Sequence, residues 1–169
     1  MRIYRITTRH SQLTDVSTPH TPSDLSGVGS SVIVLLNQMY SEILQGNWSG
    51  GVHDGYFLNS YFYNTDAGAD GDGIRYKCYM RKGTYKLFFF SRKGPNDGIV
   101  DIKIDGNVVA TIDLYHPDSN VYNAVSIVEN IVVSDDGLKT IDLVVNGKNP
   151  DSTGYTVSLS ALCFILTST

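Results

Sequence analysis

Residues 98–106 read Gly-Ile-Val-Asp-Ile-Lys-Ile-Asp-Gly, and this stretch decides the fold class. Apolar and charged residues alternate along it, and a period of two places them on opposite faces of a β-strand. The pair Asp105-Gly106 then joins this run to a second alternating run. An Asp-Gly pair between two such runs is a strong signal for a two-residue hairpin turn. The stretch therefore predicts two antiparallel strands, each with one buried face.

The same alternation recurs over most of the chain beyond Tyr56. It covers, in chain order, residues 74–81, 85–90, 141–145 and 155–165. We therefore predict an all-β fold, a jelly roll or β-sandwich of eight or nine mainly antiparallel strands over residues 47–169. The last run is apolar on both faces, which is typical of a central or covered strand. The expected core consists of Tyr85, Leu87, Ile102, Ile104, Ile112, Leu143 and Leu159.

Length and composition are those of one folded domain. The chain has 169 residues, of which 41% are hydrophobic and 18% charged, a balance typical of globular proteins. The net charge of -4 leaves no broad basic surface for nucleic acid. No run approaches the ~20 apolar residues of a membrane helix, and no signal-peptide pattern is visible, so we expect folding in a cytoplasm. There Cys78 and Cys163 are expected as buried free thiols, and a disulfide between them stays open.

Residues 1–29 differ from the rest and predict an extended N-terminal arm. Residues 10–31 are rich in Ser, Thr, Pro, Gly and Asp, and prolines cannot continue a strand ladder. Three arginines and no acidic residue fall within the first ten positions of an otherwise acidic chain. Such a basic end suits docking onto an acidic neighbour, and it also fits three solvated side chains. These arginines are Arg2, Arg5 and Arg9.

Residues 30–46 predict one short helix. Apolar residues recur there at helical spacing, a serine at position 30 or 31 can cap the start, and Gly46 can end it. Four of them have the spacing of a coiled-coil seam, namely Val32, Leu36, Met39 and Ile43. So short a helix must pack on something. Two alternatives stay open, namely its own β-domain or the axis of a homo-oligomer, for which we expect a trimer.

Motifs of catalysis are missing, so we do not expect an enzyme. The sequence has no G-x-S-x-G, Walker A, H-E-x-x-H or C-x-x-C pattern, and its four histidines are scattered. The richest polar segment is residues 64–73, in which three carboxylates are interspersed with glycines. Asp66, Asp70 and Asp72 are a weak candidate site for Ca²⁺. The segment lacks the spacing of an EF-hand, and a solvated hairpin loop uses the same residue types.

Aromatic residues are the remaining candidates for a binding site. Trp48, Tyr61, Tyr63 and Tyr115 lie in loops or strands, and some of these side chains must face outward. Exposed aromatic rings can stack on sugar rings or fill a protein interface. Tyrosine is equally a normal residue of β-sandwich strands, so a purely structural role stays open.

Residues 71–166 contain a series of short sequence segments, here called phrases, each of which leads into a predicted strand. They include Gly71-Asp72-Gly73-Ile74, Gly83-Thr84-Tyr85-Lys86-Leu87 and Gly137-Leu138-Lys139-Thr140-Ile141. In this order the phrases resemble the galactose-binding-like jelly roll of carbohydrate-binding modules. The resemblance implies the fold more than any ligand, because the phrases are structural turns. Lys139 stands where such modules often have His, and Ser160 stands where they often have Asp.

Domains of this kind also occur in tailed-phage virion proteins, and the whole chain resembles such a component. It begins with Met1, shows no signal and joins a basic arm to one jelly roll. The resemblance implies a virion structural protein, first of all a capsid decoration protein that docks on the major capsid protein. The alternatives are a tail-fibre or receptor-binding component, or a free-standing carbohydrate-binding module, either of which would contact a surface glycan.

Overall fold

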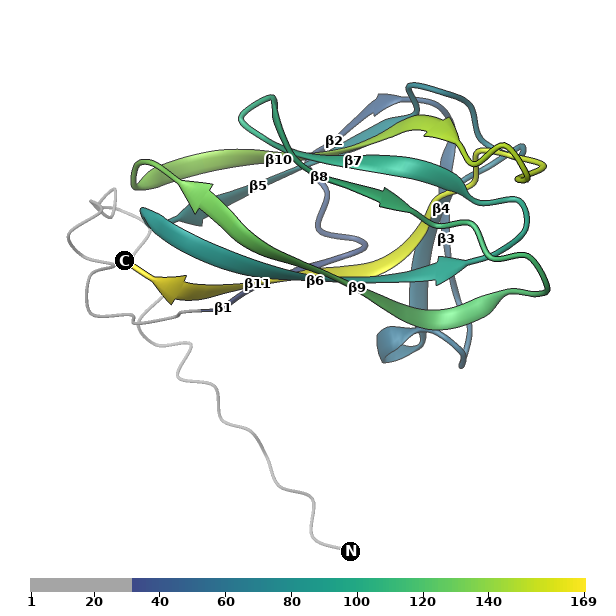
Figure 1. The fold of residues 1–169 in the computed structure, drawn as a ribbon, viewed down its shortest axis with the longest axis horizontal. Coiled ribbons are helices and arrows are strands. Elements are labelled where there is room, and N and C mark those ends of the chain that lie inside the picture. The colour runs from purple at the N-terminus through teal and green to yellow at the C-terminus, as the bar shows by residue number, and fades with distance from the viewer. Residues whose placement is uncertain (1–31) are drawn as a thin grey trace, which may run out of the picture.

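Eleven strands form two facing antiparallel sheets in a computed structural model, which describes residues 32–169 (Figure 1). Sheet A has the strand order β3-β4-β11-β6-β9, and β1 also pairs with β11. Its members are β1 (Val32–Leu36), β3 (Trp48–Val52), β4 (Ser60–Asn64), β6 (Gly83–Lys93), β9 (Val121–Val133) and β11 (Ser158–Ser168). Sheet B has the order β2-β5-β10-β7-β8, with β2 (Glu42–Gln45), β5 (Gly73–Met80), β7 (Gly98–Ile104), β8 (Asn107–Asp113) and β10 (Gly137–Lys148).

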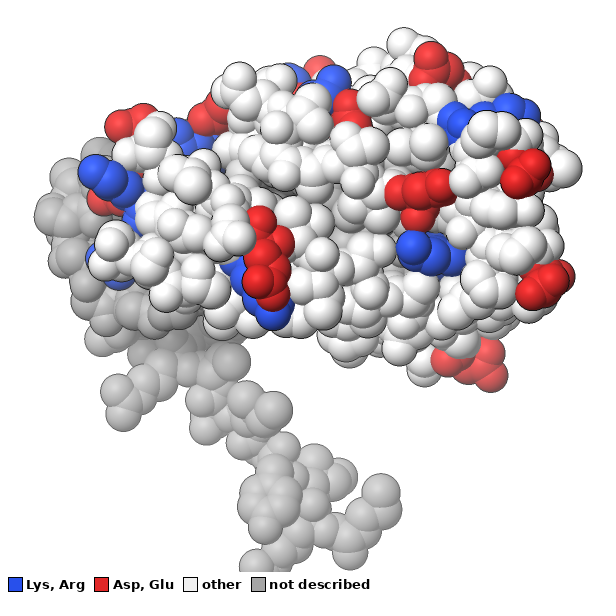
Figure 2. All heavy atoms as spheres, viewed as in Figure 1, with Lys and Arg blue, Asp and Glu red and all other residues white. Residues whose placement is uncertain are grey.

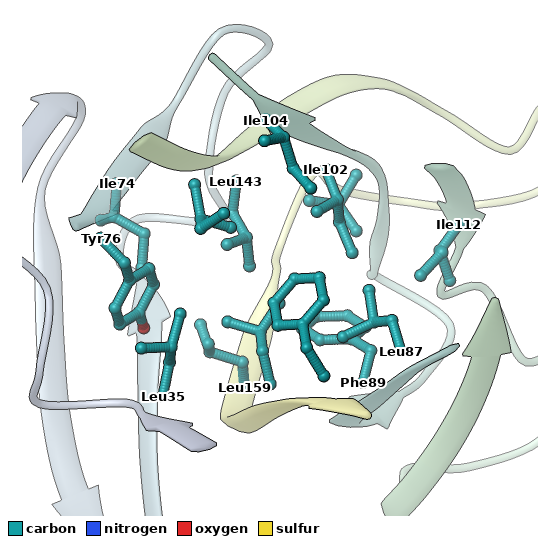
Figure 3. Close-up of a cluster of buried hydrophobic side chains, with 14 of the residues drawn as sticks. Leu35, Ile74, Tyr76, Leu87, Phe89, Ile102, Ile104, Ile112, Leu143 and Leu159 are labelled. Atoms are coloured by element: carbon teal, nitrogen blue, oxygen red, sulfur yellow. The ribbon is translucent and has the colours of Figure 1, made fainter. Parts of the chain in front are cut away.

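The core lies between the two sheets, as Figure 3 shows, because the alternating residues of both sheets point inward. All seven residues predicted for it are buried. The hairpin prediction is also confirmed, since β7 and β8 are joined by Asp105 and Gly106 alone. Both turn residues have positive φ, 49° and 81°, which a two-residue hairpin turn of this type requires.

The predicted helix over residues 30–46 is wrong. Its described part contains β1 and β2, which belong to different sheets. The apolar run Val32–Leu36 begins with three β-branched residues, and it pairs with the apolar strand β11 along its whole length. That pairing outweighs the helical spacing, because strand formation is decided by the neighbours a segment packs against. No coiled-coil seam exists here, and Met39 is 54% exposed.

Strand β11 is central in sheet A, as its two apolar faces indicated. A register shift between Leu159 and Ala161 places a β-bulge at Ser160. The bulge reverses which residues point inward, so that Leu162 and Phe164 enter the core with Leu159. A simple period of two had placed Cys163 inward, and it is only half-buried. Both cysteines are free thiols. Burial, together with the nearby Asp105 carboxylate, raises the pKa of the Cys78 thiol to about 11.

The predicted arm, with Arg2, Arg5 and Arg9, lies outside the described residues. Apart from β1 and β2, the strand count agrees with the prediction, because nine strands follow them. The only helical segment within residues 32–169 is the short 3-10 helix η3 (Phe57–Asn59). No helix in that range is long and apolar enough to cross a membrane. On the face seen in Figure 2, basic and acidic side chains lie scattered between wide uncharged areas.

Candidate functional site

An aromatic cavity of about 260 Å³ opens on the outer face of sheet A, the face that points away from sheet B. We call it the aromatic pocket. It lies where the ends of β4, β6, β9 and β11 meet the loop between β3 and β4. In Figure 1 this loop projects past the sheet that contains β6, β9 and β11. The residues that line the pocket are His53, Tyr56, Tyr61, Tyr63, Arg92, Tyr122 and Ser158.

Strand β4 and its loop supply most of the rings. Tyr61 and Tyr63 alternate with buried Phe62, so β4 anchors its inner face in the core and presents two tyrosines outward. The paired strand β3 carries Gly51 beside Tyr61, and a Cβ there would lie 2.7 Å from the Tyr61 hydroxyl. A glycine is therefore needed for the Tyr61 ring to lie against β3.

The β3–β4 loop folds back on itself and holds His53 and Tyr56 over the sheet. The His53 carbonyl accepts from the Tyr56 amide at 3.1 Å, and the Tyr56 carbonyl accepts from the Asn59 amide at 2.9 Å. Leu58 and Asn59 both have a φ of 54°, a left-handed conformation that non-glycine residues rarely adopt. The loop is thus closed by a strained turn before β4 begins.

The rings form one continuous cluster. His53 stacks on Tyr122 with centroids 4.6 Å apart, and Tyr56 stacks on Tyr61 at 4.9 Å. Tyr56 also meets Tyr122 edge-on at 5.2 Å, and Tyr61 lies 5.7 Å from Tyr63. Rings packed in this way hold each other in place, so the pocket has preformed aromatic walls.

Polar groups form the floor of the pocket. The Arg92 guanidinium donates to both carboxylate oxygens of Asp97, one at 3.1 Å, and to Asn96 Oδ1 at 3.3 Å. Asp97 is fully buried, and burial raises the pKa of its carboxyl while the ion pair with Arg92 opposes that rise. Tyr56 Oη and Ser158 Oγ share a hydrogen bond of 2.8 Å, and burial raises the pKa of the Tyr56 phenol. The floor therefore combines hydroxyl groups with a cation that is already neutralised.

Two of the four predicted ligand-binding aromatics belong to this pocket, Tyr61 and Tyr63. Trp48 lies elsewhere, stacked on Phe62 at 5.6 Å, with its indole N–H donating to the Gln45 carbonyl. Tyr115 follows β8, forms an isolated bridge with Gly94 and is not among the residues that line the pocket. The pattern missed His53, Tyr56, Arg92 and Ser158. The density of aromatic residues between positions 53 and 63 was the available signal for two of them.

The three aspartates of the predicted calcium site direct their carboxylates to different partners. Asp72 is buried and accepts from Asn64 Nδ2 at 3.0 Å and from the Ala69 amide at 2.9 Å. Asp70 accepts from the Gly147 amide at 2.7 Å, and Asp66 accepts from the neighbouring threonine hydroxyl at 3.2 Å. Within residues 32–169 no three acidic, His or Cys side chains converge as metal ligands. These hydrogen bonds order the loop without a bound ion, and Ca²⁺ binding by the segment stays a prediction.

Comparison with solved structures shows which fold this is. The CBM36-1 domain of a multidomain xylanase from the hindgut metagenome of Trinervitermes trinervoides has a TM-score of 0.54 and 20% identity, over 79% of this chain and 95% of that one. A family 35 carbohydrate binding module from Clostridium thermocellum has a TM-score of 0.55 and 16% identity, over 79% and 96%. A CBM36 module in complex with calcium and xylotriose has a TM-score of 0.53 and 16% identity, over 78% and 98%.

At the level of sequence, no family model and no curated protein matches the chain. The structural matches have low identity and therefore show the fold alone, the jelly roll of carbohydrate-binding modules. The fold that the resemblance implied is thereby confirmed. None of these three structures supports the predicted virion role.

Proposed function

We propose that this protein is a glycan-binding domain without catalytic activity, and that it holds a neutral sugar in the aromatic pocket. The observation that carries the proposal is the preformed cluster of five rings around a polar floor. The apolar C–H faces of a sugar ring can pack on aromatic walls, and its hydroxyl groups can bond to a polar floor. The solved carbohydrate-binding modules of this fold support the same reading, which favours the alternative function over a virion role.

A neutral ligand follows from the charges at the site. Arg92 and His53 are the only basic side chains in the lining, and Asp97 already accepts from two nitrogens of the Arg92 guanidinium. A uronate carboxylate would lose its own hydration on entering the pocket, and it would meet a guanidinium whose charge Asp97 already neutralises. A hydroxyl group of a neutral sugar needs no counter-charge.

Binding without catalysis follows from the same lining. Glycoside hydrolysis normally needs two carboxyl groups that flank the scissile bond. None of the pocket-lining residues is Asp or Glu, and Asp97 below the floor is fully buried. The aromatic pocket can therefore orient a sugar but holds no acid–base pair to cleave its bond.

The test is a glycan array with neutral and uronic-acid sugars, followed by calorimetry on the glycan that binds. Tyr122→Ala removes one exposed wall and should weaken binding about tenfold. Tyr79→Ala is the matched control, because Tyr79 lies on β5 in sheet B. Binding should persist in EDTA, since the acidic loop carboxylates have protein partners. An empty array, or equal losses in the two variants, would overturn the proposal.

A further inference from the structure

On one of its two sides, strand β11 pairs with two different strands in succession. Residues Ala161–Ile165 pair with β1, whereas Ser158 and Leu159 pair with β4. Both partners run antiparallel to β11, so the end of β1 and the start of β4 compete for the same position beside Ser160. The two strands separate there, and the β-bulge at Ser160 lies at the point of separation.

The separation of β1 and β4 leaves a cavity of about 370 Å³, which we call the fork pocket. Its apolar walls come from both strands and their flanking residues. Leu36 ends β1 and Met39 follows it, while Phe57 and Leu58 precede β4. Its remaining lining is polar but uncharged, with Asn37, Gln38, Ser60 and Ser160. Apolar walls with a few hydroxyl and amide groups are the usual lining of a small-molecule site.

The polar groups of the fork pocket include one that is unsatisfied. Ser160 is buried, and its hydroxyl has no hydrogen-bond partner among residues 32–169. A buried hydroxyl without a partner costs free energy, so its presence calls for an explanation. The neighbouring Asn37 amide is already in use, because it donates to Ser60 Oγ at 2.8 Å. Gln38 is exposed at the rim.

The fork pocket and the aromatic pocket are lined by residues that are neighbours in the chain. Consecutive residues of the β3–β4 loop separate them, since Tyr56 lines the aromatic pocket and Phe57 lines the fork pocket. Ser158 and Ser160 line one pocket each, and two residues along a strand correspond to about 7 Å. Phe57 stacks on Phe90 of β6 at 4.5 Å, which places the loop over the outer face of sheet A.

We propose that the fork pocket is a second sugar subsite, so that the ligand is a neutral oligosaccharide chain of at least two rings. The chain crosses the Tyr56–Phe57 segment, with one ring in each pocket. The inference rests on glycan binding in the aromatic pocket, and it adds a requirement for chain length. The uncharged lining of the fork pocket offers no counter-charge to an acidic sugar.

The experiment uses the full chain and an array printed with neutral sugars of one to four rings, in xylose, glucose, mannose and galactose series. Calorimetry then follows the best series ring by ring. For the unmodified protein the affinity should rise about tenfold from one ring to the length that fills both pockets, and then level off. Leu58→Ala and Met39→Ala should abolish this gain and leave the affinity for a single ring unchanged. Both side chains are more than half exposed, so these variants should fold.

Leu138→Ala is the control, because Leu138 is an equally exposed leucine on β10 of sheet B. Amide chemical shifts of Gln38 and Leu58 should move with the longer sugar and stay in place with the single ring. Affinity that is independent of length, or length dependence that survives both variants, would overturn the second subsite alone. A protein that binds no sugar of any length overturns the proposed function as well.

Discussion

The Arg92 guanidinium can line an aromatic pocket because the Asp97 carboxylate neutralises its charge. The Asp97 carboxylate is fully buried and accepts from the guanidinium through both oxygens. Lys86, on the same strand, pairs with Glu129 at 2.7 Å, but the Glu129 side chain is 60% exposed. The two ion pairs on β6 therefore differ clearly in burial, so their contributions to the free energy of unfolding can be compared.

We expect Asp97→Asn to lower the free energy of unfolding by about 3 kcal/mol, because it leaves a buried cation without its counter-charge. Glu129→Gln should cost less than about 1 kcal/mol, since solvent screens an exposed pair. Urea unfolding of the two variants checks both values. Equal and small losses would mean that the Arg92 guanidinium is solvated in the native state.

At the scale of elements, β1 is the segment whose structure differs most from its sequence pattern. Val34 lies directly opposite Cys163 in the β1–β11 pair, and Leu36 lies opposite Ala161. Cα atoms of directly opposed residues are about 4.5–5.5 Å apart, which is within the range that a disulfide spans. A helix over residues 30–46 would not hold residue 34 in that position.

The variant Val34→Cys should therefore form a disulfide with Cys163 under mild oxidation, detected as a linked peptide by mass spectrometry. Leu36→Cys is the control, because its diagonal separation from Cys163 is about 7–8 Å, too long for the bond. Efficient cross-linking of both variants, or of neither, would contradict the register of β1 against β11.

At the scale of the whole molecule, the outer face of sheet A carries an apolar strip beside the two pockets. Paired positions place one row of apolar residues across four strands, and a second row follows beside it. The rows are Val34, Cys163, Phe88 and Ile127, then Leu36, Ala161, Phe90 and Val125. Val34 and Val125 are each 44% exposed and Ile127 is 53% exposed, whereas Ala161 is buried and Leu36 also lines the fork pocket. Exposed apolar areas of this kind usually mark interaction sites.

The homo-oligomer expected from the sequence stays a prediction, and the strip provides a surface for it in place of the absent helix seam. Two copies that pack these faces together would bury apolar area on both sides. Ile127→Lys should then shift the full-length protein towards the monomer in light scattering. Val108→Lys, at an equally exposed position on β8 of sheet B, should leave the mass unchanged. A monomeric unmodified protein would remove the stable oligomer.

The sequence by itself determined the β-sandwich, its core and its hairpin turn. These features depend on the local alternation of residues such as Ile102 and Ile104 and on the local chemistry of Asp105-Gly106, and both can be read from neighbouring positions. Segment Val32–Leu36 fitted a helical spacing although it begins with three β-branched residues, and only its pairing with β11 makes it a strand.

The tertiary structure alone decided the pockets. Tyr56, Arg92, Tyr122 and Ser158 are separated by tens of residues and meet because four strands end at one place. The bulge at Ser160 also reversed the inward face of β11, since one extra residue shifts a period of two by half its length. Long-range strand pairing sets both features, and a local sequence pattern carries no information about which distant strand will be the neighbour.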